Sequence, residues 1–212
     1  MIECIASERI ETNCYLIEEE GHALIIDPSC GKFIIDKLTE KGWEPDYIIL
    51  THEHYDHIWD LEEVRDHYGI PVIASSLCSE RVQSIQTNLS SIGDILIYFK
   101  TGEEPSEPGK RFTCRAAEIT FDETYTMNWR GHDFEFQRIP GHSPGSVLIT
   151  MDQNSVFTGD YMIYGEPDMT RLKGGSKKDY DRITLPVLDA IPADFHVYPG
   201  HGPDYIKKND TK

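Results

Sequence analysis

The sequence lacks the features that would point to a membrane, a disulfide framework or a nucleic acid. No apolar run approaches the roughly 20 residues that a transmembrane helix needs. The five cysteines are widely spaced and form no Cys-x-x-Cys pair, so neither a thiolate zinc site nor a set of disulfides is predicted. Basic residues are scarce, with 20 Lys and Arg against 37 Asp and Glu and a formal net charge of −17. Because nucleic-acid surfaces are normally basic, this balance argues against DNA, RNA and anionic membranes as partners and leaves a small molecule as the substrate.

The amino terminus also lacks the pattern of a signal peptide. Glu3 stands where such a peptide would carry basic residues, and no long apolar stretch follows it. We therefore expect a cytoplasmic protein. A chain of 212 residues with 39% apolar and 27% charged residues is typical of one globular domain, which we expect to span residues 1–212.

Short β-rich segments separated by turn residues predict strands in two groups. The first group is at residues 2–6, 14–18, 23–27, 46–50 and 71–74, and the second is at 132–139, 146–151, 155–158 and 195–198. Helices are expected at 33–41, 60–68, 79–89 and 178–190, with Asp60 as the N-cap of the second. Two strand groups, each followed by helices, indicate an α/β protein in which two sheets pack face to face with helices outside.

The middle of the chain, at about residues 75–130, has the least regular pattern and is expected to be a variable insert that determines the substrate. Within it, residues 101–111 are rich in glycine, proline and glutamate and are predicted to form a mobile loop. This loop either forms a lid over the site or extends into solvent without a role at the site.

A dense cluster of potential metal ligands directly follows the apolar residues 47–50. The run Thr51-His52-Glu53-His54-Tyr55-Asp56-His57 places three imidazoles and a carboxylate within residues 52–57. Imidazole and carboxylate are the ligands that zinc and similar divalent metals favour. Three further candidates stand in turn-like sequences downstream, namely His142, Asp160 and His201. The remaining histidines lie in no such context and are expected at the surface or in packing; they are His22, His67, His132 and His196.

The spacing of these residues divides them between two metal ions. Residues two apart in extended backbone point to the same side, so His52 and His54 can reach one ion. Adjacent residues cannot share that direction, so Asp56 and His57 are assigned to a second ion, about 3.5–4 Å away in a bridged pair. Each ion needs completion from a distant turn. The predicted sites are His52, His54 and His142 for the first ion, Asp56, His57 and His201 for the second, and Asp160 as the bridge.

Together these motifs resemble the metallo-β-lactamase fold superfamily of metallohydrolases, and within it the hydroxyacylglutathione hydrolase (glyoxalase II) branch. The pattern Thr-His-x-His-x-Asp-His stands at 51–57, Pro-Gly-His-Thr-Pro-Gly-Ser at 140–146 with Ser143 for threonine, Phe-Thr-Gly-Asp at 157–160 and Tyr-Pro-Gly-His-Gly at 198–202. The resemblance implies a four-layer αββα sandwich holding two divalent ions, zinc first, with iron or manganese as alternatives. The helical C-terminal domain of long glyoxalase II proteins is not expected, because the chain ends soon after His201.

The chemistry of such a site favours acyl substrates with a good leaving group. Water shared by two metal ions has its pKa lowered from about 15.7 toward about 7, which gives a hydroxide that Asp56 would orient toward a carbonyl. A thiolate leaves almost unaided, whereas an amide nitrogen needs a proton from a positioned acid. Since the motifs commit their carboxylates and imidazoles to metal, we expect thioesters or related small acyl compounds as substrates. Tyr55 and Tyr161 are the candidate proton donors.

A cluster of basic residues is a candidate site for binding the substrate. Arg171 and Lys173 precede Gly174-Gly175, just before the helix expected at 178–190. Cations at a helix N-terminus work against the helix dipole, so they are not explained by helix stability. The segment is either a site for a substrate carboxylate or phosphate, or a solvated loop.

Three other functions fit parts of the pattern. A mononuclear iron persulfide dioxygenase of the same superfamily would use His52, His142 and Asp160. A phosphodiesterase or nuclease would use the same ligands, although the acidic balance argues against it. A non-catalytic binding protein is disfavoured by the complete ligand set. True β-lactamases of the superfamily generally carry cysteine or serine at the position of Asp160, which argues against that activity.

Overall fold

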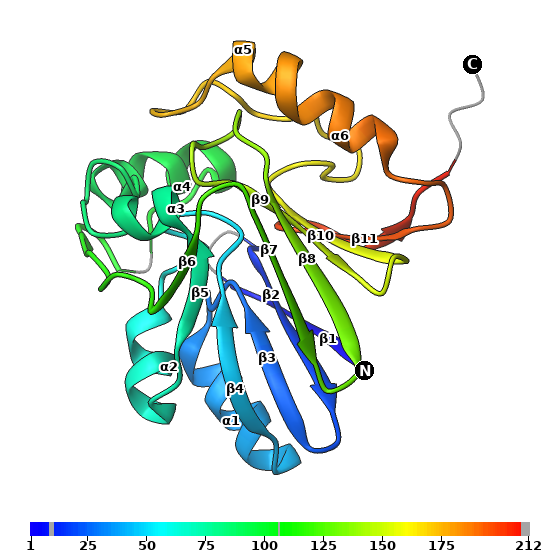
Figure 1. Ribbon diagram of the computed structural model, residues 1–212. Coiled ribbons are helices and arrows are strands. Elements are labelled where there is room, and N and C mark those ends of the chain that lie inside the picture. Colours follow the sequence, from blue (N-terminus) through cyan, green and yellow to red (C-terminus); the bar gives the residue numbers. More distant parts are fainter. Residues whose placement is uncertain (9–10, 106, 209–212) are drawn as a thin grey trace.

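The computed structural model describes residues 1–8, 11–105 and 107–208, so Ser106 of the expected mobile loop lies outside the described residues. Two six-stranded sheets pack face to face, with helices on their outer faces (Figure 1). The first sheet has the order β1-β2-β3-β4-β5-β6 and the second β12-β11-β10-β9-β8-β7. The expected α/β sandwich is therefore confirmed.

Both sheets are mixed. The first contains β1 (Ile2–Ala6), β2 (Asn13–Glu19), β3 (His22–Ile26), β4 (Glu44–Ile49), β5 (Val72–Ser75) and β6 (Ile119–Phe121). Its first three strands are antiparallel, and β3 to β6 run parallel. The second contains β7 (Thr124–Trp129), β8 (His132–Arg138), β9 (Val147–Met151), β10 (Ser155–Gly159), β11 (His196–Pro199) and β12 (Tyr205–Ile206). Only its β10–β11 pair is parallel among the described ladders.

Alternating side chains of the central strands bury apolar groups on both faces, as the period of two in a strand requires. In β2, Tyr15 and Ile17 join the core between the sheets, whereas Cys14 and Leu16 face the helices outside. On that outer side lie α1 (Gly31–Lys41) and α2 (Leu61–Tyr68). The second sheet is covered by α6 (Leu185–Ala190), which follows the short α5 (Lys177–Asp179) and the π-helical turn η2 (Tyr180–Thr184). The single helix expected at 178–190 is therefore broken into three pieces.

Each expected strand is present, with bounds shifted by at most two residues. Two further helix expectations need correction. Asp60 stands at the N-cap of α2 but its side chain does not cap that helix; its Oδ2 accepts from Gly31 N at the start of α1 instead (2.9 Å). The helix expected at 79–89 is replaced by the shorter α3 (Ser76–Arg81). Directly after it, the Val82 carbonyl accepts from Cys114 N (3.0 Å).

The segment between β5 and β6 carries two helices near the ligand loops, α3 and α4 (Gly93–Thr101), with the 3₁₀ turn η1 (Ser90–Ile92) between them. Strands β6 and β7 place the second part of the expected insert, from Ile119 onward, in the sheets. No helix among the described residues is long and apolar enough to cross a membrane. All five cysteines are free thiols, four of them buried.

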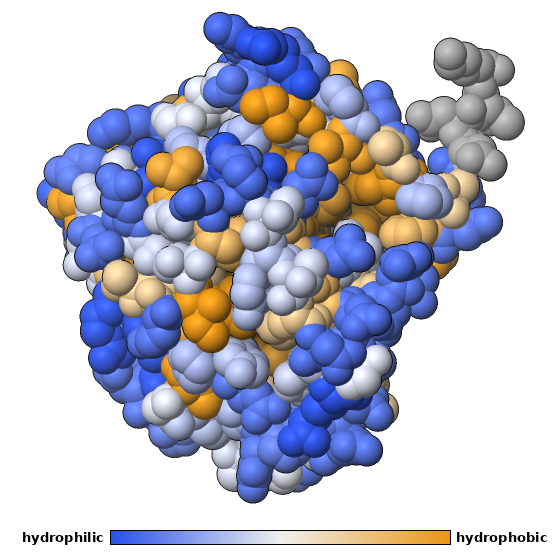
Figure 2. All heavy atoms as spheres, in the orientation of Figure 1, coloured by the Kyte–Doolittle hydropathy of each residue, from blue (hydrophilic) through white to orange (hydrophobic). Residues whose placement is uncertain are grey.

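Apolar side chains gather in a hollow below α6, on a surface that is otherwise largely polar (Figure 2). A groove of about 1020 Å³ lies there, lined by residues that include Met162, Leu188, Ile191 and Tyr205. Its lining contains none of the seven predicted ligands. The groove adjoins the loop after β10 rather than the ligand cluster itself.

Candidate metal centre

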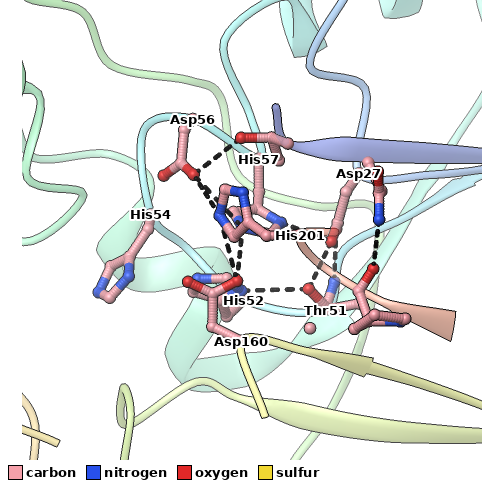
Figure 3. Close-up of polar contacts among 12 residues, drawn as sticks. Asp27, Thr51, His52, His54, Asp56, His57, Asp160 and His201 are labelled. Carbon is pink, nitrogen blue, oxygen red and sulfur yellow. Dashed lines mark hydrogen bonds and ion pairs between the residues drawn. The ribbon is translucent and has the colours of Figure 1, made fainter. Parts of the chain in front are cut away.

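The predicted ligands meet at one edge of the two sheets, although they come from four separate segments. Figure 3 labels all of them except His142. His52, His54, Asp56 and His57 lie on the loop after β4. The other three follow strands of the second sheet: His142 in the turn after β8, Asp160 directly after β10, and His201 after β11. Strand ends of both sheets thus bring residues more than a hundred positions apart into one buried cluster.

The first group contains the three histidines expected to share one ion. One ligand atom from each of His52, His54 and His142 lies within 4.8 Å of the others. His142 Nε2 is 2.9 Å from His54 Nδ1. All three side chains are buried, with at most 2% of each residue exposed. This arrangement can present three imidazole nitrogens to a single ion.

The second group is formed by Asp56, His57 and His201, whose ligand atoms also lie within 4.8 Å of one another. Asp56 Oδ2 is 3.2 Å from His201 Nε2 and 3.5 Å from His57 Nε2. The Thr12 hydroxyl donates to the same carboxylate oxygen (3.0 Å). The group can therefore present two imidazoles and a fixed carboxylate to a second ion.

Asp160 lies between the two groups. Its Oδ1 is 3.0 Å from His57 Nε2 and 3.5 Å from His201 Nε2, in the second group. Its Oδ2 is 3.4 Å from His142 Nε2, in the first group. Since the two oxygens of one carboxylate face different groups, Asp160 has the placement that a bridging ligand requires.

Hydrogen bonds behind the ligands fix which ring nitrogen is free. His57 Nδ1 donates to Asp27 Oδ2 (2.8 Å), and His142 Nδ1 donates to the Met169 carbonyl (2.8 Å). Asp27 also accepts from Thr51 N (2.8 Å) and Thr51 Oγ1 (2.5 Å). With a proton on Nδ1, His57 and His142 keep the lone pair of Nε2 for a metal.

Sequence reasoning missed Asp27. It stands directly after β3, at the same sheet edge as the ligands, with a positive φ of 53°. A buried carboxylate in the first turn after a strand was the available signal. It also joins His52 and His57 in a third set of potential ligands, but its bonds to Thr51 and His57 identify it as a support behind the ligands.

Burial and neighbouring charges shift the pKa values of the candidate ligands in different directions. Burial, together with neighbouring imidazoles, holds the pKa of His52 and His54 well below the ordinary value, so both are neutral. Burial would raise the pKa of Asp160, but His201, His57 and His142 outweigh it and hold the pKa well below its usual range. For His57, burial lowers the pKa and the carboxylates of Asp56, Asp160 and Asp27 more than reverse this. The cluster is thus strongly acidic and attracts cations.

Unsatisfied buried atoms test whether these residues fit metal ions. His52 Nε2, His57 Nε2 and Asp160 Oδ1 are buried and accept or donate no hydrogen bond among the described residues. Such atoms are rare in folded proteins and call for an explanation. Their convergence on two small regions fits two divalent ions bound through nitrogen and oxygen, which zinc, iron and manganese all accept.

The two tyrosines expected as proton donors are both buried. Tyr161 is 1% exposed, and its hydroxyl accepts from His142 N (2.6 Å) and donates to the Ile139 carbonyl (2.8 Å). It therefore supports the His142 turn, and its role as a proton donor to the substrate stays a prediction. Tyr55 packs in an apolar cluster with Trp59 and Ile97, and burial raises the pKa of its hydroxyl.

The expected substrate cations lie at the surface. Arg171 and Lys173 are exposed, and within the described ranges no hydrogen bond or ion pair fixes either side chain. Their loop flanks the His142 turn, where Ser176 N donates to the Gly141 carbonyl (2.8 Å). A cation that sequence reasoning missed lies closer: Lys100 Nζ, in the last turn of α4, is 3.0 Å from His201 Nδ1. No motif marks Lys100, because α4 was not expected.

The histidines left outside the predicted sites lie away from the ligand cluster. Three pair with carboxylates at the surface, namely His22 with Asp46, His132 with Asp152 and His196 with Asp204, and His67 packs beside Tyr68.

Comparisons with known proteins agree with this geometry. Among curated proteins, the chain is 30% identical over 197 residues to the probable metallo-hydrolase YqgX of Bacillus subtilis (strain 168), covering 92% of this chain and 87% of the relative. It is 25% identical over 213 residues to the hydroxyacylglutathione hydrolase GloC of Haemophilus influenzae, covering 95% and 90%.

Solved structures share the fold. The crystal structure of the BLEG-1 B3 metallo-beta-lactamase superposes with a TM-score of 0.79 at 27% identity, covering 97% of this chain and 94% of that one. The structure of TTHA1623 in a di-iron-bound form gives a TM-score of 0.73 at 24% identity, covering 96% and 94%, and shows the fold alone.

A family model described as the metallo-beta-lactamase superfamily matches residues 8–201, which include every predicted ligand. The match spans both sheets, and the resemblance inferred from the motifs is confirmed. The chain belongs to the metallo-beta-lactamase superfamily.

Proposed function

We propose that this metallo-hydrolase is dinuclear and cleaves thioesters or related small acyl compounds. The observation that carries the proposal is Asp160, whose two oxygens face the two histidine groups. A single-ion site would use only one of these two oxygens as a ligand. The relative named hydroxyacylglutathione hydrolase supports the substrate class, but its 25% identity leaves the substrate itself to experiment.

Each residue has a distinct part in the proposed reaction. His52, His54 and His142 would hold one ion, Asp56, His57 and His201 the other, and Asp160 both. When bound, two divalent ions lower the pKa of a shared water toward about 7 and polarise a carbonyl. The Thr12 hydroxyl and His201 fix the Asp56 carboxylate, so Asp56 can accept a hydrogen bond from the attacking water and orient it.

The leaving group decides between substrates. The pKa of Asp160 is held well below its usual range, so it is no proton donor, and the Tyr161 hydroxyl is already committed to the backbone. An amine would therefore leave poorly, whereas a thiolate, with a reference pKa of about 8.5, needs little assistance. Lys100 places a positive charge beside His201, where it would attract an anionic substrate. These features support thioesters of acidic character.

A substrate panel tests the proposal. The zinc-loaded protein is assayed with a glutathione thioester, a nitrophenyl ester, a β-lactam and a bis-nitrophenyl phosphate. Oxygen consumption with glutathione persulfide is followed on the iron-loaded protein, because zinc has no redox chemistry. We expect kcat/KM for the thioester to exceed the others, loss of turnover in Asp160→Asn, and normal turnover in the surface control His196→Gln.

Two results would contradict the proposal. Turnover of the β-lactam or the phosphodiester without turnover of any thioester would assign another hydrolase activity. Oxygen consumption with one iron per chain would assign the dioxygenase reaction, which needs only His52, His142 and Asp160. The panel includes a β-lactam because a B3 metallo-beta-lactamase shares this fold at 27% identity.

A further inference from the structure

Glu53 is a buried carboxylate that the metal site does not use. It stands between His52 and His54 in the ligand loop and is 0% exposed. Its Oε1 accepts from Arg81 Nε (2.5 Å), and its Oε2 accepts from the Ser143 hydroxyl (2.8 Å). Burying a charge is costly unless a partner compensates it, so this pair requires an explanation.

The Glu53 carboxylate connects the two loops that build the first metal group. Ser143 directly follows His142, so one side chain ties the loop of His52 and His54 to the turn of His142. The approach is close: a Cβ on Gly145 would lie 2.5 Å from Glu53 Oε2 and 2.7 Å from Cys78 N. Only glycine at position 145 allows this contact.

Arg81 extends the connection to a third segment. It is the last residue of α3, and its side chain is 17% exposed. The guanidinium lies against Gly174, where an added Cβ would overlap Arg81 Nη2. The start of the same helix is also tied to the His142 turn, because the Ser75 hydroxyl donates to the Gly145 carbonyl (2.8 Å). Helix α3 therefore supports the turn from both of its ends.

The second metal group has separate supports. Asp27 orients His57, the Thr12 hydroxyl fixes Asp56, and His201 is held through the pairing of its segment with residues 12 and 13. None of these contacts includes Glu53 or Arg81. Asp27 also reaches the first group through Thr51, whose hydroxyl lies 3.1 Å from His52 Nδ1, whereas the described contacts of Glu53 are all on the side of the first group.

We propose that the Glu53–Arg81 ion pair is a positioning device for the first metal group, so that the affinity of His52, His54 and His142 for their ion depends on it. Glu53 and Arg81 touch neither ligand atoms nor substrate. They act by fixing the distance between two loops. The proposal rests on the ligand assignment and not on the thioester substrate.

Zinc binding measured in two single-site backgrounds tests the proposal. His201→Ala leaves the first group as the intact set, and His54→Ala leaves the second. Glu53→Gln is introduced into each, and the affinity for Zn²⁺ is measured by competition with a chromophoric chelator. Changes to groups that orient metal ligands typically cost about 10- to 100-fold in affinity. We expect a loss of about this size in the His201→Ala background and a change below about 3-fold in the His54→Ala background.

Matched variants separate positioning from a general loss of stability. Arg65→Met breaks an ion pair away from the metal site, that of the buried Arg65 with the half-exposed Glu118 on the outer side of the first sheet. It should lower the melting temperature without changing zinc affinity in either background. Ser143→Ala removes one contact of Glu53 and provides a milder variant if Glu53→Gln does not fold.

Three outcomes would overturn the proposal. Equal losses of zinc affinity in both backgrounds would indicate a general structural role. Unchanged zinc affinity in Glu53→Gln and Ser143→Ala would remove any link to the metal site. A loss in Arg65→Met as large as that in Glu53→Gln would attribute the effect to stability. None of these measurements depends on turnover. They therefore test the positioning role of Glu53 even if the proposed thioester substrate is wrong.

Discussion

Asp27→Asn is the substitution with the most direct predicted effect on the second metal group. Asp27 Oδ2 accepts from both His57 Nδ1 and Thr51 Oγ1, and Oδ1 accepts from Thr51 N. Asparagine retains one oxygen. If that oxygen stays opposite Thr51 N, the amide NH₂ faces His57 Nδ1, which must then accept. The ring proton moves to Nε2, the atom that faces the metal group, and blocks it.

The size of the effect follows from the lost bond. Hydrogen bonds to charged groups contribute about 1.5–3 kcal/mol. At about 1.4 kcal/mol for each factor of ten, this converts to a loss of about 10- to 100-fold in zinc affinity. If the amide flips instead, Thr51 N loses its acceptor and the ligand loop is destabilised by a similar amount.

The assay is zinc competition in the His54→Ala background, which reports on the second group. Asp46→Asn is the matched control, because Asp46 also faces a histidine (His22 Nδ1, 3.0 Å) but lies near the other end of β4. We expect Asp46→Asn to leave zinc affinity unchanged. A folded Asp27→Asn protein with the affinity of its parent would refute the tautomer argument.

Three further predictions concern stability. Tyr161→Phe should lower the free energy of unfolding by about 1–3 kcal/mol, measured by chemical denaturation, because His142 N and the Ile139 carbonyl lose their buried partner. Burial alone would lower the pKa of His132, but its contact with Asp152 raises it above 6.5. This contact therefore stabilises fully below pH 6.5 and is lost as the pH rises through the raised value, so Asp152→Asn should flatten the pH dependence of the melting temperature in that range. Chelation should lower the melting temperature, since zinc at a hundred times its Kd adds about 2.7 kcal/mol, and an unchanged value would argue against bound metal.

The ligands could be predicted from the sequence because their signals are local. The apolar residues 47–50 predict a strand. The dense cluster of histidines directly after them indicates a metal site. His142, Asp160 and His201 each stand in a turn-like sequence after a strand, and strand ends in a face-to-face sandwich meet at a common edge. Short-range patterns thus specified both the elements and their chemical groups.

The supporting residues could not be predicted because their partners are distant. Glu53 occupies an unspecified position in the ligand pattern, and its partners Arg81 and Ser143 are 28 and 90 residues away. Tyr161 follows a ligand directly, which suggested chemistry, yet its hydroxyl contacts a backbone group 22 residues before it. The meaning of a buried polar side chain depends on which groups the tertiary fold places beside it.

The segment between β5 and β6 carries two cations that lie near the candidate metal groups. The candidate ligands and Asp27 come from strand ends. Helices α3 and α4 each bring a cation close to them: Arg81 bonds Glu53 in the ligand loop, and Lys100 lies beside His201 in the second group. Arg81 is largely buried and paired, so it acts on geometry. Lys100 is exposed, and the proposed function gives it a part in attracting an anionic substrate. We therefore predict that differences in activity among chains with this ligand pattern follow the segment between β5 and β6.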